Sequence, residues 1–189
     1  MKKLFCIFLL IFGAFFVHVQ FAKAQNDQEL KLASLPLGIS EEKIDYQLPY
    51  PGLLPDNPFY PLKVLRDRII SLFISDPLKK AEFYLLDANK RLNGAFYLFN
   101  KDKTKIELVQ STISKAENYF EQAILKTQEA KKQGIDTSDI QEEMSESLIK
   151  YQEILETISS KPSAFKSDFV SLENRVTVLD KLVKALSSS

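Results

Sequence analysis

The stretch "DPLKKAEFYLLDANKRLNGAFYLF", residues 76–99, sets the pattern on which most of the chain is built. Asp76 followed by Pro77 is typical of a helix start, because the carboxylate can accept a hydrogen bond from a free backbone N–H and proline is tolerated at the first helical position. Apolar residues then recur at alternating spacings of three and four, which places them in one seam along a helix. The seam residues are Leu78, Ala81, Leu85, Ala88, Leu92, Ala95 and Phe99.

Three later stretches repeat this spacing. In residues 104–133 the seam is Ile106, Val109, Ile113, Ala116, Phe120, Ala123 and Thr127. In the next helix it is Ile140, Met144, Leu148, Tyr151, Leu155 and Ile158. In the last helix, which is entered through Lys161-Pro162-Ser163, it is Phe165, Phe169, Leu172, Val176, Leu179, Val183 and Leu186.

The ends of these helices carry signals of their own. Thr104 with Glu107, and Ser138 with Gln141, have the spacing of capping boxes at two helix starts. Gly134 predicts a helix end, because glycine adopts the left-handed backbone conformation that commonly follows the last helical turn.

Four seams joined by links of only a few residues predict an all-α fold with antiparallel neighbours, because short connections cannot return the chain along a parallel path. A helix of about 30 residues is roughly 45 Å long. We therefore expect residues 76–187 to form an elongated antiparallel bundle. We favour a four-helix up-and-down bundle. A long hairpin with a looser second hairpin is the alternative, because the periodicity of a seam does not determine how many helices pack against it.

The N-terminus has the pattern of a secretory signal peptide, residues 1–24. Lys2 and Lys3 precede an apolar run, residues 4–17, and Ala22-Lys23-Ala24 supplies small residues for a signal peptidase. The run is shorter than the roughly 20 residues of a membrane-spanning helix, so we expect cleavage near Ala24-Gln25 rather than a retained anchor. The product would be exported to the periplasm, the cell surface or the medium, with residues 25–45 as a flexible leader.

Cleavage would change the composition of the chain. The only Cys (Cys6) and the only His (His18) would be lost, and Trp is absent. Of 25 basic residues, the loss of Lys2, Lys3 and Lys23 would leave 22 against 25 acidic ones, a net charge of about −3. A weakly acidic chain is a poor nucleic-acid binder. Without His or Cys the acid–base and nucleophilic groups are few, so we expect no enzyme activity and no cofactor.

Glu142, Glu143 and Glu146 are the carboxylates that most suggest a metal site. Carboxylate-bridged metal sites inside bundles typically draw on Glu-x-x-His pairs, and the mature chain would have no histidine. The three glutamates lie near a predicted helix N-terminus, where the helix dipole favours negative charge. We therefore expect a solvated acidic face and no bound metal.

The segment "LPYPGLLPDNPFYP", residues 48–61, is rich in proline and aromatic residues. Its prolines restrict the backbone, so fixing it costs little chain entropy, and Tyr50-Pro51-Gly52 predicts a turn. Asn57-Pro58 can cap a short amphipathic helix, residues 63–74. The segment fits a clip on the protein's own helices or a proline-rich ligand for an aromatic groove. We favour the clip, because its large apolar groups gain from burial.

Two aromatics of the first long helix, Phe83 and Tyr97, fall outside the seam with Lys90 between them. Large exposed apolar patches are rare, so we expect the proline-rich segment and the short helix, together residues 46–75, to cover them. The candidate clip or interaction residues are therefore Tyr46, Tyr50, Pro51, Gly52, Leu53, Leu54, Pro55, Pro58, Phe59, Tyr60, Phe83 and Tyr97.

The run "PYPGLLPDNPFYPLKVLRDRIISLFISDPLKKAEFYLLDANKRL", residues 49–92, resembles a bacterial family of exported proteins catalogued only as a domain of unknown function. Its members similarly join a Tyr-Pro-Gly turn, a Leu-Pro-Asp-Ser/Asn-Pro segment, a short helix, and an Asp-Pro start to a helix rich in Lys and Ala. The resemblance implies a helical exported domain, and it implies no catalytic residue, substrate or cofactor.

Two lysine clusters could touch an anionic surface: Lys101, Lys103 and Lys105, and Lys126, Lys131 and Lys132. Neighbouring acids dilute their field, which disfavours contact with a membrane surface. We expect a non-enzymatic protein of the cell envelope that acts through an unknown protein partner or as a structural helical module. The alternative is an extracytoplasmic chaperone-like or lipid-binding protein that uses an apolar helical groove. Neither hypothesis fixes the oligomeric state.

Overall fold

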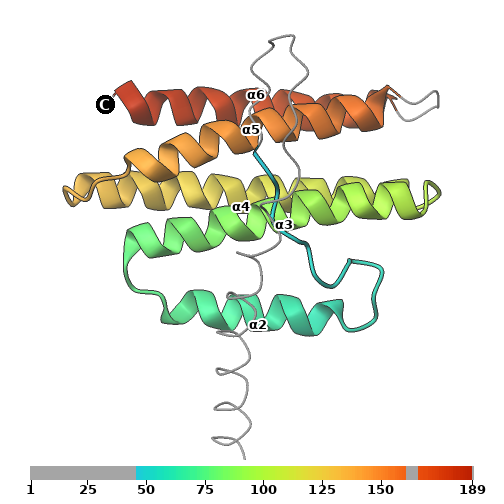
Figure 1. Cartoon of the computed structure of the whole chain (residues 1–189), viewed down its shortest axis with the longest axis horizontal. Coiled ribbons are helices and arrows are strands. Elements are labelled where there is room, and N and C mark those ends of the chain that lie inside the picture. The colour runs from blue at the N-terminus through green and yellow to red at the C-terminus, as the bar shows by residue number, and fades with distance from the viewer. Residues whose placement is uncertain (1–45, 161–165, 189) are drawn as a thin grey trace, which may run out of the picture. The chain divides into compact units, whose positions relative to one another are not determined.

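A computed structural model describes residues 46–160 and 166–188, and the regular secondary structure in these ranges is entirely helical (Figure 1). The helices are α2 (Tyr60–Phe73), α3 (Pro77–Lys101), α4 (Ile106–Lys132), α5 (Ser138–Ser159) and α6 (Lys166–Ser188). All described residues belong to one unit, residues 44–189. The predicted signal peptide, the leader, Lys161-Pro162-Ser163 and Phe165 lie outside the described residues.

Helices α3 to α6 form an antiparallel bundle. The chain reverses its direction at each link from α3 to α6 (Figure 1). Helix α3 packs against α4 and α5 against α6, and the two hairpins meet through contacts of α3 with α5 and of α4 with α6. These contacts join both hairpins around shared apolar side chains. The prediction of an all-α helical bundle is confirmed.

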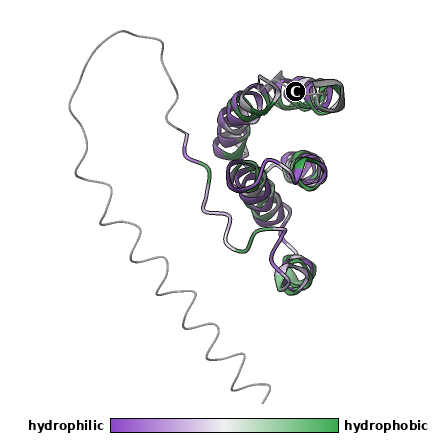
Figure 2. Ribbon diagram, turned by 90° about the vertical axis from the view of Figure 1, so that its right-hand side faces the viewer, coloured by the Kyte–Doolittle hydropathy of each residue, from purple (hydrophilic) through white to green (hydrophobic). Residues whose placement is uncertain are grey.

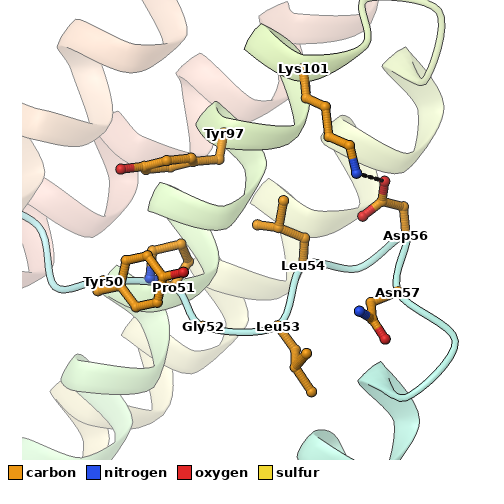
Figure 3. A pocket seen from close by; sticks show the side chains of 9 residues that line it. All are labelled: Tyr50, Pro51, Gly52, Leu53, Leu54, Asp56, Asn57, Tyr97 and Lys101. Carbon is orange, nitrogen blue, oxygen red and sulfur yellow. Dashed lines mark hydrogen bonds and ion pairs between the residues drawn. The ribbon is translucent and has the colours of Figure 1, made fainter. Parts of the chain in front are cut away.

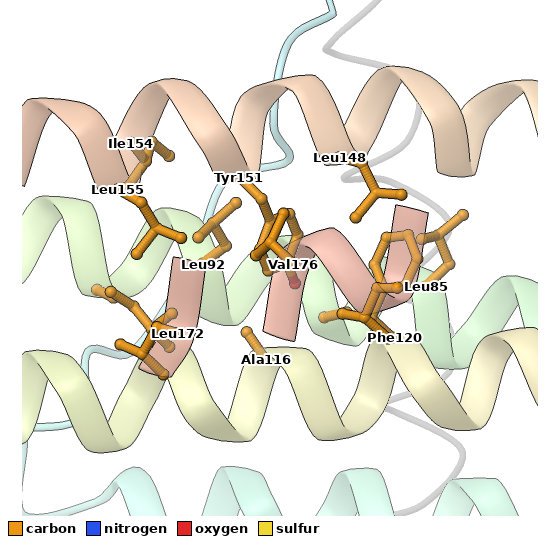
Figure 4. Close-up of a cluster of buried hydrophobic side chains, with 14 of the residues drawn as sticks. Leu85, Leu92, Ala116, Phe120, Leu148, Tyr151, Ile154, Leu155, Leu172 and Val176 are labelled. Carbon is orange, nitrogen blue, oxygen red and sulfur yellow. The ribbon is translucent and has the colours of Figure 1, made fainter. Parts of the chain in front are cut away.

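The seam residues fill the interior of this bundle (Figure 4). Every seam residue named above whose side chain is described is buried except Leu78, which is partly buried and packs against the same core. Phe120 of α4 and Tyr151 of α5 meet edge to face at its centre, with ring centroids 5.6 Å apart. Leu98, Ile124 and Ile154 are also buried, although they fall outside the strict seam spacing.

Two of the predicted helix ends are confirmed. The backbone N–H of Lys79 donates to Asp76 Oδ1 at 2.8 Å, so Asp76 caps α3. Gly134, with φ of +76°, follows α4, and its N–H donates to the carbonyl of Lys131 while the N–H of Ile135 donates to that of Ala130. This pair of hydrogen bonds is the Schellman motif that terminates many helices.

The two predicted capping boxes are wrong. Thr104 donates from its backbone N–H and its hydroxyl to Asp102 Oδ1, and no side chain caps the start of α4 at Lys105. Ser138 likewise bonds to the carboxylate of Asp136, two residues before it. In both links the aspartate accepts from the backbone N–H and the hydroxyl of the residue two positions later, and the N-cap position falls one residue away from the predicted one, at Lys105 and at Thr137.

Helix α2 begins earlier than predicted, at Tyr60 rather than at Lys63. Pro61 occupies the first turn, where its missing N–H costs no intrahelical hydrogen bond. Asn57 does not cap the helix: its Oδ1 accepts from the backbone N–H of Phe59 at 2.9 Å and closes a turn before it.

Candidate interaction site

The proline-rich segment begins with an anchor on α3 and α5. Asn89 of α3 donates from Nδ2 to the hydroxyl of Tyr46 at 2.7 Å, and this hydroxyl donates to Glu143 Oε1 of α5 at 3.1 Å. Asn89 Oδ1 in turn accepts from the hydroxyl of Ser147. Burial and the carboxylate of Glu143 raise the pKa of Tyr46, so the phenol stays protonated at neutral pH.

The middle of the segment lies against one face of α3. Asn93 Nδ2 donates to the carbonyl of Pro49 at 3.0 Å. Pro51 is buried beside Gly94, where a Cβ added to the glycine would lie 3.5 Å from the Cβ of Pro51. Gly52 follows with φ of +68°, which is the conformation that the predicted turn requires.

The end of the segment is held by charge. Asp56 Oδ2 lies 2.9 Å from Lys101 Nζ and 3.0 Å from Lys105 Nζ. Hydrogen bonds from these two lysines lower the pKa of Asp56. The cluster of lysines predicted at this end of α3 therefore binds the protein's own chain through two of its members.

The candidate residues divide between the two sides of the segment. Tyr46, Pro51, Leu54, Pro55 and Tyr60 are buried or half-buried, whereas Tyr50, Gly52, Leu53, Pro58 and Phe59 are exposed. The exposed side borders a shallow cavity of about 200 Å³, with Tyr97 and Lys101 of α3 on one wall and the run from Tyr50 to Asn57 around the rest (Figure 3).

The cover expected over the aromatics of α3 is incomplete. Tyr97 borders the cavity and stays 49% exposed. Phe83 is half-buried, and its ring lies 6.1 Å from that of Tyr84. The segment crosses α3 beside Gly94 instead, because a position without a side chain leaves room for the ring of Pro51.

A charge cluster lies where α2 meets α3. It consists of the buried Asp67, Asp87 and Arg91 and the half-buried Lys63, and we call it the buried charge cluster. Arg91 Nη1 is 3.5 Å from Asp87 Oδ2, and the Arg91 guanidinium stacks over the ring of Tyr119 at 4.0 Å. Burial raises the pKa of Asp87, partly offset by Arg91, and Asp67 and Lys63 of α2 act on the same carboxylate. Helix α2 thus turns its polar side, including buried Asp67 and Ser71, toward α3.

The apolar side of α2 therefore faces outward, which overturns the expectation that this helix covers other residues with its apolar face. Five large side chains at helical spacing are between 44% and 83% exposed. We call them the α2 stripe: Leu62, Leu65, Ile69, Leu72 and Phe73. Figure 2 shows α2 at the edge of the described unit, with both apolar and polar residues along it. Sequence reasoning identified the amphipathic helix and expected it to help cover Phe83 and Tyr97, but it did not predict that the polar side faces α3.

A further buried carboxylate lies inside the bundle, at Glu117 of α4. Its side chain is fully buried, and its Oε2 lies 3.8 Å from Arg175 Nε of α6. Burial raises the pKa of Glu117 to about 8, although Arg175 opposes the rise. Neither Glu117 oxygen nor the buried hydroxyl of Tyr151 has a hydrogen-bond partner among the described residues. The spacing of apolar residues in this helix did not predict a buried carboxylate at position 117.

The described part of the chain holds neither a cluster of metal ligands nor a membrane-spanning helix. Within residues 46–160 and 166–188, no three His, Cys, Asp or Glu side chains gather as metal ligands, and Glu143 bonds to Tyr46 instead. In the same ranges no helix has both the length and the apolar character needed to cross a bilayer.

The fold and these surfaces define an all-α bundle with a clip-like segment and a short helix whose apolar side is exposed. Residues 52–161 match the family described as Domain of unknown function (DUF5667), and the chain belongs to this family. The matched range extends the resemblance seen over residues 49–92 through α3, α4 and α5. No curated protein and no solved structure matches the chain.

Removal of the proline-rich segment is expected to destabilise the bundle. A chain that starts at Asp56 loses the Tyr46 hydrogen bonds and the burial of Leu48 and Pro51, together worth about 3 kcal/mol. Urea denaturation, followed by the helical signal, should show a lower midpoint than for residues 25–189. In the chain from residue 25, Gly94→Leu should lower the midpoint similarly by displacing Pro51, whereas Gly94→Ala should not. An unchanged midpoint in both disruptive forms would show that the segment does not act as a clip.

Proposed function

We propose that this protein is a non-enzymatic, exported component of the bacterial cell envelope that acts by binding, and that the α2 stripe is its binding surface. The signal-peptide pattern of residues 1–24 supports export, and the lack of Cys and His in the rest of the chain supports a role without catalysis. The bundle then serves as a rigid carrier for α2.

The exposure of the α2 stripe carries this proposal. A helix in water gains free energy by turning its apolar side toward the protein and its charges outward. Here Asp67 is buried while Phe73, only six residues later, is 83% exposed. Contiguous exposed apolar side chains of this kind are typical of interaction surfaces.

The alternative of a ligand cradled in an apolar groove has weaker support. The interior of the bundle is filled by the seam side chains, with Phe120 and Tyr151 packed at its centre. The stripe lies on the convex surface of a single helix, which fits contact with an external surface better than enclosure of a small molecule.

A photo-crosslinking amino acid placed at position 69 tests the proposal in cells that produce the protein. Ile69 is 44% exposed in the stripe, and Val178 of α6 is 53% exposed, so Val178 is a matched control of similar size and exposure. We expect crosslinks to an envelope component from position 69 and few from position 178. Equal crosslinking at both positions, or none at position 69, would argue against a binding role for α2.

A further inference from the structure

The exposed surface of α2 is cationic as well as apolar. Arg66 and Arg68 are exposed on either side of the stripe. Asp67 is the only acidic residue between Phe59 and Ser75, and it is buried, with Oδ1 2.6 Å from Arg66 Nη2. The occupant of this surface must therefore accept apolar side chains and bring negative charge.

A second copy of the chain does not meet this requirement. Antiparallel pairing of two α2 helices would set Arg66 of one beside Arg68 of the other, without an exposed carboxylate on α2 to compensate. With 14 residues, α2 is about 21 Å long. One helix contact of that length buries much less than the roughly 800 Å² per partner of a typical stable dimer.

The geometry of α2 instead fits the surface of an anionic bilayer. Interfacial helices lie in the membrane plane, with Leu, Ile and Phe among the acyl chains and Arg or Lys reaching the phosphates. The stripe supplies the apolar side, and Arg66 and Arg68 flank it. Helices α3 to α6 all lie to one side of α2 (Figures 1 and 2). Because the side chains of the stripe are between 44% and 83% exposed, a flat surface can approach them.

We infer that α2 binds peripherally to anionic phospholipid, with the stripe inserted and the two arginines at the headgroups. This inference rests on the proposed function, since it names the partner class of the same surface. It concerns a different surface from the lysine clusters of the sequence analysis, of which Lys101 and Lys105 pair with Asp56. Helix α2 combines exposed apolar side chains with exposed arginines in one place.

Vesicle sedimentation with residues 25–189 tests the inference. The probes are vesicles of equal parts phosphatidylglycerol and phosphatidylcholine, and vesicles of phosphatidylcholine alone. We expect partition onto the anionic vesicles to be about tenfold stronger, and Ile69→Glu to weaken it at least tenfold. Val178→Glu makes the same charge change at another exposed apolar position and should change partition less than twofold. Since both sites are exposed, helical signal and urea midpoint should stay unchanged in both variants.

Four results would overturn the inference. They are absence of binding to anionic vesicles, equal binding by Ile69→Glu, a concentration-dependent dimer that Ile69→Glu abolishes, and a crosslink from position 69 into residues 25–45 of the same chain. The third would make a second copy the occupant, and the fourth would make it the leader. Crosslinking of position 69 to an envelope protein without vesicle binding would overturn the lipid assignment but preserve the binding function of α2.

Discussion

Glu117→Gln should raise the free energy of unfolding at pH 8.5 by several kcal/mol and leave it nearly unchanged at pH 5. The pKa of Glu117 rises from an ordinary value of 4.5 to about 8 in the folded protein, mainly through burial. Such a rise corresponds to a difference on the order of 5 kcal/mol between the two protonation states. Glutamine has the shape of the protonated acid and cannot lose a proton, so it removes the cost of ionisation.

The direction follows from proton binding. Between pH 4.5 and 8 the unfolded chain has released the Glu117 proton while the folded protein still holds it. The folded state then binds more protons, so stability falls as pH rises through this window. The contribution is fully present below the unfolded pKa of 4.5 and is lost above the folded pKa of about 8.

Urea denaturation of the wild type and Glu117→Gln at half-unit steps from pH 5 to 8.5 measures this effect. The wild-type midpoint should fall with pH and that of the variant should stay flatter. Glu121→Gln is the matched control, because Glu121 also contacts Arg175, at 3.0 Å, but is 47% exposed at the side chain. Parallel curves for the wild type and Glu117→Gln would show that Glu117 is ionised in the folded protein throughout the range.

The main architecture of this fold could be predicted because its seams are regular. A spacing of three and four places Leu85, Leu92 and Phe99 on one side of a helix whatever its partners are, and all three are buried. The helix start at Asp76 and the helix end at Gly134 could also be predicted, since each residue interacts with backbone groups only a few residues away. Local signals of this type need no knowledge of the tertiary structure.

The orientation of α2 could not be predicted, because it depends on residues distant in the sequence. The pattern from Leu62 to Phe73 predicts a helix with one apolar side, and in most proteins that side is the buried one. Here Lys63 and Asp67 of α2 lie close enough to Asp87 and Arg91 of α3 to affect them electrostatically, so the inward side of α2 is the charged one. The spacing of Asp87 and Arg91 by four residues, beside the seam of α3, was the available sign of a buried ion pair.

The local predictions failed where the helix start is displaced by one residue. Thr104 and Ser138 stand at correct capping-box spacing, but they donate to Asp102 and Asp136, and the N-cap positions are Lys105 and Thr137. The place where the clip packs on α3 could not be predicted either. Gly94 determines where Pro51 packs, and a glycine carries no apolar side chain from which this contact could be inferred.

Arg91→Met should destabilise the bundle by about 3–5 kcal/mol at neutral pH. The Arg91 side chain is 3% exposed, and its guanidinium pairs with Asp87 and stacks on Tyr119. Methionine fills a similar volume but leaves the Asp87 carboxylate buried without its cation. The loss should shrink as the pH falls, because Asp87 then takes up a proton and ceases to be a buried charge.

A double-mutant cycle separates the charge from the packing. Asp87→Leu together with Arg91→Met removes both charges and should recover most of the stability that Arg91→Met loses, because a buried ion pair contributes little over well-packed apolar groups. Lys79→Met provides a control on the same helix: its pair with Glu82 is exposed, so the cost should stay below about 0.5 kcal/mol. A double variant no more stable than Arg91→Met would show that the arginine acts through its shape.

The Arg91→Met substitution should also weaken the attachment of α2 to α3. Arg91→Met leaves the Asp87 carboxylate close to Asp67 of α2 without its cation, and the repulsion between these two carboxylates should make α2 detach more often than in the wild type. Trypsin cleavage after Arg66 or Arg68, followed by mass spectrometry under native conditions, should then become faster than cleavage within α3. Vesicle binding should weaken as well, because a detached helix no longer presents its stripe in a fixed orientation. Unchanged cleavage with a lowered urea midpoint would limit the buried charge cluster to a role in the bundle.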